Sequence, residues 1–529
     1  MNILDYQKIP KDYIINNNQK GLIINHGLGS GKTITAINIC EYYSKDEIIV
    51  ITPASLQNNF IKELNKYNVA NITRYKITSY ESFHKLIGNI DVLSYYDNIE
   101  DIKELTNKEI REIGSKYISN YNENLTKKEI LNNIERLLKL KQNNEKNDFF
   151  LKNKIVVIDE AHRLHNNKGK ISRMILNEVK YAKKILLLTG TPIVNFPNDI
   201  SPLINLLNNN KSLPEGKKQF DSLFIDESIQ KITKPLFKIF SYSFFEQSYY
   251  CKKIEIKNKD LFKSKIKGLF SYYKNNLSDN FPSIEILYKG IVMSKLQESI
   301  HTKIESDTLT SEDIKKMKGT NENINITNRI NCYLNKTRQI SNIAKGEIEL
   351  EKKSLYYQLQ ISPKLISMIK TISNLSKPAL IYSNYLDFGI NPIKELLIKH
   401  NFKILIFTGE TSMQRKKEII QEYNSGKADI LLISSSGGEG LDLKNTRQIH
   451  IMEPHWNNSK INQIIGRGVR FKSHVNLPEN ERNVKIFHWY SKFKKSGVSA
   501  DEYLIEHSKK KDELNNKFVE LIKEVSIEN

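Results

Sequence analysis

Short apolar runs recur in the first 205 residues and again after residue 361, separated by stretches with helical spacing. The runs are rich in β-branched residues, do not alternate with polar ones, and are followed by loops. This pattern is typical of parallel strands that are covered on both faces. The sequence therefore predicts an α/β fold with strands at Leu22–Ile24, Ile48–Ile51, Lys154–Ile158, Lys184–Leu188, Pro378–Tyr382, Lys403–Phe407, Asp429–Ile433 and Gln448–Met452.

The segments between and after these runs differ in character. Residues 87–150 are rich in Asn, Lys and Glu, with a helical stretch near Ile130–Leu140, and we interpret them as an insertion. A solvated decoration is the simplest role for it, and a partner surface is the alternative. After residue 484 one further strand precedes a charged helix, Asp501–Val525. We expect a first lobe at 1–205, a mainly helical region at 206–360, a second lobe at 361–483 and a helical extension at 484–529.

The charge of the chain suggests a polyanionic partner. Lys and Arg total 81 against 60 Asp and Glu, a formal charge of +21. Such an excess is typical of proteins that bind nucleic acid. AT-rich codon usage could supply much of the lysine, so this interpretation stays open. Only 12 of the 81 basic residues are arginines, and two of these, Arg467 and Arg470, lie three positions apart.

Other compositional features exclude several classes of protein. Cys40, Cys251 and Cys332 lie far apart, form neither a disulfide framework nor a zinc cluster, and fit a reducing compartment. No apolar run approaches the roughly 18–20 residues of a membrane helix. The first residues lack the basic and apolar regions of a secretory signal. We therefore expect an intracellular protein with no membrane partner.

A candidate phosphate-binding loop follows the strand Leu22–Ile24 and precedes a helical run, Ile34–Tyr43. Its sequence is His26-Gly27-Leu28-Gly29-Ser30-Gly31-Lys32-Thr33. Glycines let backbone N–H groups face phosphates, and the N-terminus of the helix adds positive potential. Lys32 would reach the β- and γ-phosphates of ATP, and Thr33 would ligate Mg²⁺. His26 occupies the position at which the common form of this motif has its first glycine.

A pair of carboxylates completes the candidate ATPase site. Four apolar residues, Ile155–Ile158, place Asp159 and Glu160 at the carboxyl end of a strand, where open α/β sheets bind ligands. Asp159 can hold Mg²⁺ through its water shell, and Glu160 can orient and deprotonate the attacking water.

These motifs resemble those of the superfamily 2 helicases and translocases, and further motifs follow in the same order. The resemblance implies that Gln7 recognises adenine and that Arg467 and Arg470 are arginine fingers. It also implies two further groups of residues. Those that couple hydrolysis to lobe movement would be His162, Thr189, Thr191 and Gln463. Those that contact nucleic acid would be Thr52, Pro53, Thr78, Ser436 and Gly437.

Two details narrow the resemblance. Trp456-Asn457 is similar to the Trp-Asn element of Swi/Snf-type DNA translocases. The segment Gly466–His474, followed by Leu477-Pro478, resembles the branch of poxvirus and giant-virus transcription ATPases. The resemblance implies two RecA-like lobes that hold ATP and Mg²⁺ between them. It favours DNA over RNA as partner and implies a viral RNA polymerase or transcription-factor subunit, in the virion and the host cytoplasm.

Several alternatives stay open at the level of sequence. The protein could instead be a strand-separating RNA or DNA helicase, or a transcription-factor subunit that uses ATP as a switch. Trp456 could pack in a core, and His162 could do the same. Asp442 could only cap a turn, and Arg470 could pair with an acid inside the second lobe.

Overall fold

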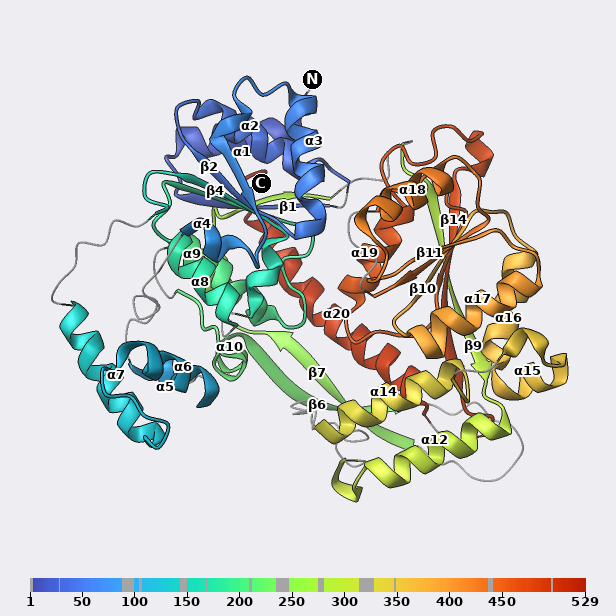
Figure 1. Cartoon of the computed structure of the whole chain (residues 1–529). Helices are drawn as coiled ribbons and strands as arrows, with labels where there is room; N and C mark the ends of the chain where they lie inside the picture. Colours follow the sequence, from blue (N-terminus) through green and yellow to red (C-terminus); the bar gives the residue numbers. More distant parts are fainter. Residues whose placement is uncertain are drawn as a thin grey trace.

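The computed structural model describes residues 3–27, 29–87, 99–103, 107–142, 150–166, 169–208, 212–234, 247–274, 280–313, 328–346, 349–435, 441–495 and 498–529. Two α/β lobes lie next to each other, the first drawn mainly blue to green and the second mainly yellow to red (Figure 1). Each contains a parallel sheet with helices on its faces, which confirms the predicted fold class. Among the described residues, no helix has the length and apolar character needed to cross a membrane.

The sheet of the first lobe has the strand order β3-β2-β4-β5-β1-β8, with every neighbouring pair parallel. Its strands are β1 (Gly21–His26), β2 (Ile48–Ile51), β3 (Tyr75–Thr78), β4 (Ile155–Asp159), β5 (Lys184–Thr189) and β8 (Phe270–Tyr273). Its helices are α1 (Asp5–Asn16), α2 (Lys32–Tyr42), α3 (Gln57–Tyr67), α4 (Phe83–Ile87), α8 (Lys170–Val179), α9 (Ser201–Asn208), α10 (Lys217–Phe224) and α11 (Lys259–Ile266). Short 3₁₀ turns are η1 (Ala54–Leu56), η2 (Ile72–Arg74), η4 (Ala161–His165) and η5 (Pro197–Ile200).

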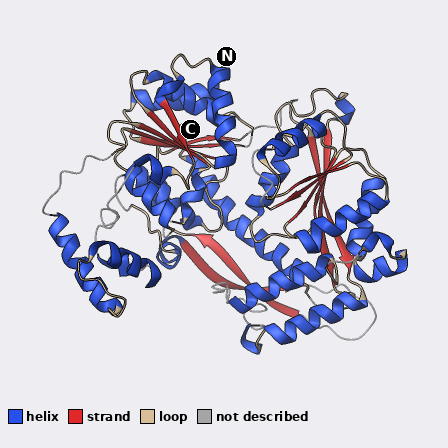
Figure 2. Cartoon of the chain, in the orientation of Figure 1, coloured by secondary structure: helices blue, strands red, loops and turns tan. Residues whose placement is uncertain are grey.

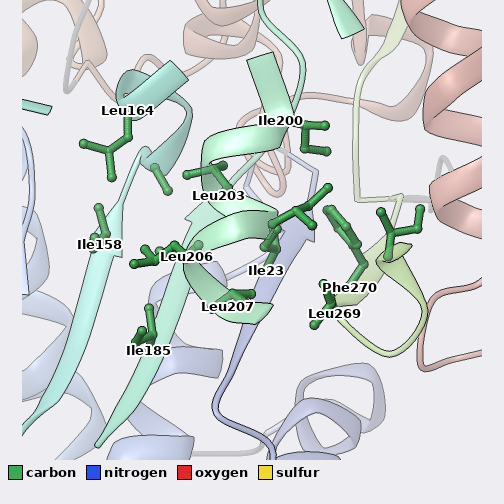
Figure 3. Packing of buried hydrophobic residues seen from close by; sticks show 14 of the residues in the cluster. Ile23, Ile158, Leu164, Ile185, Ile200, Leu203, Leu206, Leu207, Leu269 and Phe270 are labelled. Carbon is green, nitrogen blue, oxygen red and sulfur yellow. The ribbon is translucent and has the colours of Figure 1, made fainter. Parts of the chain in front are cut away.

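Burial on both faces explains the apolar runs within β1, β2, β4 and β5. Successive side chains of a strand point to opposite faces. Ile23 accordingly lies in the core formed with α8–α11 on one face, where Figure 3 shows it together with Leu203, Leu206 and Leu207 of α9. Leu22 and Ile24 pack with α1–α3 on the other face. The apolar runs therefore predicted β1, β2, β4 and β5 correctly, whereas β3 and β8 were not predicted.

The insertion forms a small unit with a core of its own. It comprises α5 (Ile99–Lys103), α6 (Asn107–Tyr117) and α7 (Lys127–Gln142). Ile102, Ile110, Ile113, Ile130, Ile134 and Leu138 are buried against one another. Because α7 covers Ile130–Leu140, the predicted helix is confirmed. The unit lies apart from the first sheet in Figure 1.

The second lobe repeats the same arrangement. Its strand order is β11-β12-β10-β13-β14-β9, again with parallel neighbours. The strands are β9 (Ser283–Val292), β10 (Ala379–Ser383), β11 (Ile404–Phe407), β12 (Ile430–Ser434), β13 (Gln448–Ile451) and β14 (Asn483–Lys492). The helices are α16 (Pro363–Ser373), α17 (Asn391–Lys399), α18 (Met413–Asn424) and α19 (Asn458–Gly468), with short turns η6 (Leu350–Lys352), η7 (Leu386–Ile390) and η8 (Glu479–Glu481).

The region 206–360, expected to be mainly helical, also supplies strands that the sequence analysis did not predict. Its further helices are α12 (Lys295–Thr308), α14 (Asn328–Asn342) and α15 (Leu355–Ile361). β6 (Ile225–Lys234) and β7 (Gln247–Ile256) form an antiparallel ribbon (Figure 2). β8 extends the first sheet and β9 the second, so the chain leaves one lobe at Tyr273 and enters the other at Ser283.

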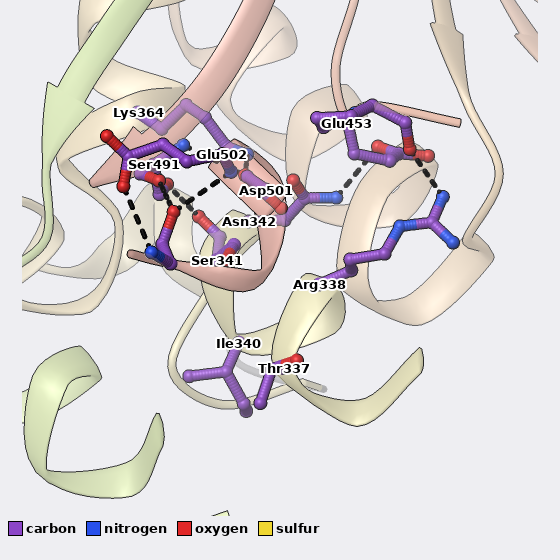
Figure 4. A network of polar contacts seen from close by, with 12 residues as sticks. Thr337, Arg338, Ile340, Ser341, Asn342, Lys364, Glu453, Ser491, Asp501 and Glu502 are labelled. Atoms are coloured by element: carbon purple, nitrogen blue, oxygen red, sulfur yellow. Dashed lines mark hydrogen bonds and ion pairs between the residues drawn. The ribbon is translucent and has the colours of Figure 1, made fainter. Parts of the chain in front are cut away.

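Helix α20 (Ala500–Glu524) connects the two lobes. It begins in the second lobe, where Ser499 and Glu502 form a capping box and Leu504 packs against α14. There the buried Asp501 carboxylate accepts from Lys364 Nζ at 3.3 Å and from Ser491 N–H at 2.8 Å, within the polar network of Figure 4. Its other end packs Phe518, Leu521 and Ile522 into the core of the first lobe.

Candidate active site

The candidate phosphate-binding loop joins β1 to α2, as predicted. Gly29 and Gly31 have φ values of +74° and +80°, which glycine adopts without strain. Lys32 is the first residue of α2, and its Nζ donates to the carbonyls of His26 at 3.0 Å and Gly27 at 3.2 Å. The ammonium group is thus held inside the curve of the loop. Leu28 lies outside the described residues.

Helix α1 holds this loop from outside. Gln7 is buried, and its Nε2 donates to the Ser30 carbonyl at 3.1 Å, while the Tyr6 hydroxyl donates to the same carbonyl at 2.6 Å. The Tyr6 ring also stacks on Tyr273, with centroids 3.6 Å apart. Gln7 therefore lies beside the loop, and its predicted role in adenine recognition stays a prediction.

The two carboxylates stand at the carboxyl end of β4, beside the loop. The Asp159 Oδ2 accepts from the Thr52 hydroxyl at 3.1 Å. Glu160 has left-handed backbone angles, φ +53° and ψ +46°, which are uncommon outside glycine and asparagine. The Tyr80 hydroxyl bonds to both backbone carbonyls, at 2.8 Å to Asp159 and 3.1 Å to Glu160. These bonds hold the bend that turns Glu160 out of the strand.

Burial sets the electrostatics of this group. Burial first, and then the neighbouring Glu160, raise the pKa of Asp159 to about 6, while Lys32 opposes the shift. Burial likewise lowers the pKa of Lys32, with Glu160 and Asp159 opposing. Removing charges from water is costly unless they are paired. The site is therefore an arrangement of closely coupled charges whose balance a bound anion and cation would change.

His162 connects the carboxylates to the Thr189 motif. Its Nδ1 lies 3.2 Å from the Thr189 hydroxyl and 3.4 Å from Glu160 Oε2. The Thr189 hydroxyl also accepts from the Thr191 N–H at 3.1 Å. Burial lowers the pKa of His162, so the imidazole is neutral at pH 7 and bonds without forming an ion pair. The structure thus brings together three of the four residues expected to couple hydrolysis to movement.

The second lobe places both arginines within electrostatic reach of Lys32, but not on one helix face. α19 ends at Gly468, and Val469 already has φ −110° and ψ +89°. Arg467 is the buried residue near this end, whereas Arg470 lies beyond it. The three-residue spacing of Arg467 and Arg470 therefore does not place their side chains on one helix face. Both still interact electrostatically with Lys32. Gln463, the fourth expected coupling residue, lies half-buried on α19.

Arg470 is paired within its own lobe. Its Nη1 donates to Asp442 Oδ1 at 3.0 Å and to the Leu441 carbonyl at 3.2 Å. Asp442 is thus an ion-pair partner, the arrangement that the sequence analysis kept as an alternative for Arg470.

The two lobes also meet directly at the loop. Phe471 lies against Gly29, where a Cβ would be 3.6 Å from the Phe471 nitrogen. Phe471 and Phe281 pack with ring centroids 5.7 Å apart, and the Lys472 N–H donates to the Asn280 carbonyl at 2.7 Å. The segment after α19 therefore rests on the phosphate-binding loop.

Three of the five residues expected to contact nucleic acid are buried in the structure. Thr52, with no exposed surface, and Pro53 are buried, and Thr78 is 8% exposed. A buried side chain offers no surface to a strand, and the Thr52 hydroxyl is directed at Asp159. A direct contact by these three side chains is therefore not supported. Ser436 and Gly437 lie outside the described residues.

Some site residues were missed from sequence and others followed the simpler interpretation. Trp456 packs against α14 and α20, and its ring meets His507 edge-on. Packing, not exposure, is therefore its role in this structure. Tyr80 is not among the residues that the sequence motifs single out. Its bonds to the carbonyls of β4 depend on strand placement, which no local pattern indicates.

Lys32 thus interacts electrostatically with the carboxylates of its own lobe and with two arginines of the second lobe. The chain belongs to the SNF2-related family: residues 7–345 match the SNF2-related domain and residues 363–472 match the helicase conserved C-terminal domain. It is an ATP-hydrolysing, nucleic-acid-dependent enzyme of this family, which confirms the expected enzyme class.

Relatives in three viruses match nearly the whole chain. The "Putative ATP-dependent RNA helicase" of Acanthamoeba polyphaga mimivirus is 32% identical over 99% of this chain and 97% of its own length. The termination factor NPH-I homolog of African swine fever virus (isolate Pig/Kenya/KEN-50/1950) is 24% identical over 97% of this chain and 76% of its own. Nucleoside triphosphatase I of Heliothis armigera entomopoxvirus is 24% identical over 99% and 78%. The resemblance to viral transcription ATPases is therefore confirmed.

Proposed function

We propose that the protein is a motor that moves along DNA during viral transcription, using ATP bound between its lobes. The observation that carries the proposal is the convergence of Lys32, Asp159 and Glu160 of the first lobe with Arg467 and Arg470 of the second. A site shared by two lobes is completed only when they approach each other. Binding and hydrolysis of ATP would therefore close and reopen the lobes.

Each of these residues receives a role from its position. Lys32 binds the phosphates together with the N–H groups at the start of α2, and Glu160 holds the attacking water as its base. The donor set of Thr33 and Asp159 consists of hard oxygens, which Mg²⁺ prefers. The fit is supported by the Asp159 carboxylate, whose burial raises its pKa, because a cation there would stabilise the charged form. Mg²⁺ would neutralise phosphate charge when bound.

Gln7 and the arginines complete the assignment. Gln7 lies on the outer side of the loop, where it would select adenine. Arg467 and Arg470 would stabilise charge on the transferring phosphoryl group, because a guanidinium offers a planar fork of donors. His162 and Thr189 would pass the state of the site to the rest of the first lobe through their hydrogen bond.

The partner is proposed to be duplex DNA, with the family match and the +21 charge as support. A viral RNA polymerase or transcription-factor subunit would direct the motor, in the virion and the host cytoplasm; the termination-factor and triphosphatase relatives support this role. A strand-separating RNA helicase is the second candidate, favoured by the name of the mimivirus relative. An ATP-dependent switch in a transcription factor is the third.

One set of measurements separates these functions. ATP hydrolysis is measured with duplex DNA, single-stranded DNA and RNA in parallel, followed by triplex displacement and duplex unwinding. We expect duplex DNA to stimulate most and triplex displacement to occur without unwinding. Stimulation by RNA with unwinding would establish the helicase instead, and stimulation without either movement would establish the switch.

A salt titration tests the polyanion interaction itself. Each duplex phosphate that is neutralised contributes about −0.9 to the slope of log affinity against log salt. We expect a slope of about −4 or steeper, from several lysines. A flat response would mean that the excess lysine reflects codon usage on a solvated surface.

A further inference from the structure

Strand β8 brings a second segment of the chain to the phosphate-binding loop. It pairs with β1 so that His26 lies opposite Tyr273, and the Gly27 N–H donates to the Tyr273 carbonyl at 2.8 Å. The loop therefore begins on a strand whose outer neighbour comes from the region between the lobes. His26, at the glycine position of the common motif, is the last residue of β1 and has no exposed surface.

A continuous chain of hydrogen bonds leads from His26 to Glu528. His26 Nε2 lies 2.7 Å from the Ser271 hydroxyl, which in turn donates to Glu528 Oε1. The other oxygen, Oε2, accepts from the Tyr272 N–H at 2.8 Å. Ser271 has no exposed surface, so its hydroxyl depends on these two partners.

The direction of each bond follows from the chemistry of the groups. An ionised carboxylate only accepts, and a serine hydroxyl has one proton to donate. Because Ser271 donates this proton to Glu528, its hydroxyl oxygen must accept a hydrogen bond from His26. The imidazole proton of His26 is then on Nε2. Glu528 thereby fixes the tautomer and the plane of the His26 imidazole. The Nδ1 of His26 faces no hydrogen-bond partner in the described part of the chain.

Glu528 is itself placed by α20. Phe518, Leu521 and Ile522 fix the end of this helix in the first lobe, and the Ile527 N–H donates to the Phe270 carbonyl at 2.9 Å. The start of the same helix is tied to the second lobe by the buried Lys364–Asp501 pair of Figure 4. The segment after α20 thus ends against the edge strand that flanks the loop.

We propose that Glu528 is a positioning residue for the phosphate-binding loop, acting through Ser271 on His26. The proposal rests on the proposed binding of ATP phosphates at this loop. The His26 carbonyl accepts from Lys32 Nζ, so the orientation of His26 sets where the lysine and the loop N–H groups stand. The imidazole takes the place of the glycine common in such loops, and Glu528 and Ser271 hold it there.

The test uses the full chain with Glu528→Gln, Ser271→Ala and a matched control, Glu524→Gln. Glu524, the last residue of α20, pairs instead with Lys263 at 2.6 Å on the surface, so its loss tests charge alone. The loop binds ground state and transition state alike, so losing its support should raise KM for ATP and leave kcat nearly unchanged. We expect KM to rise about tenfold in both test variants, as for one hydrogen bond to a charged group.

A mutant cycle separates positioning from simple destabilisation. In a His26→Phe background an aromatic ring remains but the bond to Ser271 is lost, so Glu528→Gln should change KM less than about twofold. Ser271→Thr, which keeps the hydroxyl, should retain a KM near that of the unchanged protein. A purely structural role would instead lower the melting temperature and the apparent kcat together, with KM unchanged.

The outcomes also distinguish this proposal from the proposed function. Unchanged protein that hydrolyses no ATP, or Lys32→Ala that hydrolyses it normally, would overturn the proposed function. The positioning role alone would be overturned by a different result. In that case the unchanged protein hydrolyses ATP and Lys32→Ala does not, but Glu528→Gln and Ser271→Ala have the same KM as Glu524→Gln. A tenfold rise in KM that persists in the His26→Phe background would also overturn it, because the effect would then not pass through His26.

Discussion

The two lobes hold their halves of the active site in different ways. In the first lobe, Lys32, Asp159 and Glu160 are fixed by bonds to loop carbonyls, Thr52 and the backbone that Tyr80 supports. In the second lobe, Arg470 lies past the end of its helix and bonds to a side chain that is itself 64% exposed. One half is preorganised, and the other is held by a contact that water can replace.

The difference has an energetic meaning. Exposed ion pairs contribute about 0–1 kcal/mol, so exchanging Asp442 for a phosphate costs Arg470 little. Moving a buried carboxylate such as Asp159 would cost several times more. We infer that the first lobe defines where the phosphates bind and that the second lobe supplies a side chain free to move onto them.

The largest effect is expected at Arg470. Arginine fingers contribute roughly 10³–10⁵ in rate, so Arg470→Ala should lose most of its turnover at saturating ATP and DNA, yet keep much of its ATP affinity. Arg470→Lys should restore little, because an ammonium lacks the bidentate fork. Arg415→Ala is the control, since Arg415 pairs with Glu418 and Glu422 on an exposed face of the same lobe.

A contrary result for Arg470 would be informative. A lowered melting temperature combined with near-normal turnover would make Arg470 a structural partner of Asp442, and the comparison between the lobes would fail.

Glu160→Gln tests the preorganised half. Glutamine keeps the shape but removes the base, so turnover should fall by about 10²–10⁴ while ATP and nucleic acid still bind. Glu47→Gln is a suitable control, because Glu47 lies at the opposite edge of the same sheet and pairs with Lys154 at 3.1 Å. Turnover in Glu160→Gln equal to that of the control would remove Glu160 from the role of base.

The same contrast explains which features could be predicted from sequence. Strands buried on both faces, such as Ile155–Ile158, could be predicted from their apolar residues alone. This prediction also placed Asp159 and Glu160 correctly at the carboxyl end of the strand. β8 was missed because it has only four residues and does not form an apolar run. Ser271 is polar and Tyr272 is amphipathic, and both bond to Glu528. β9 was missed because it is an edge strand with exposed residues along most of its length.

The relative placement of Arg467 and Arg470 could not be predicted from sequence, because it depends on tertiary structure. α19 ends at Gly468, where a Cβ would come within 3.1 Å of Thr446 and Ile449. That close approach favours glycine and fixes the end of the helix, so Arg470 leaves the face on which Arg467 stands. Spacing alone could not reveal this, because it depends on a strand and a loop distant in sequence.

The pH dependence of ATP hydrolysis should report the protonation of Asp159 in the first lobe. Burial raises the pKa of Asp159 to about 6, so below that pH the carboxylate is increasingly protonated and less able to hold Mg²⁺. We expect kcat/KM, which reports the free enzyme, to fall about tenfold per pH unit below pH 6 and to level above it. A profile of kcat/KM that is flat from pH 5 to 8 would contradict the coupled charges described here.

The same pKa shift affects stability. Between about pH 4 and pH 6 the folded chain binds more protons at Asp159 than the unfolded chain, so this group's contribution to stability falls as pH rises. Asp159→Asn should therefore raise the melting temperature at pH 7.5 and change it little at pH 4. An equal change at both pH values would mean that the carboxylate is not held against its ionisation.

The smallest effect is expected for Asp442→Asn. This variant is the most direct test of whether the second lobe is less preorganised than the first. If Arg470 moves onto the phosphates, its exposed partner is needed only in the open state. The substitution should then change turnover by less than about threefold, because an exposed pair contributes at most about 1 kcal/mol. Releasing Arg470 should, if anything, raise turnover slightly. The measurement is kcat at saturating ATP and DNA, beside the melting curve and the Arg470→Ala variant. A loss of turnover comparable to that of Arg470→Ala would show that the pair acts as a unit, and the second lobe would then be as preorganised as the first.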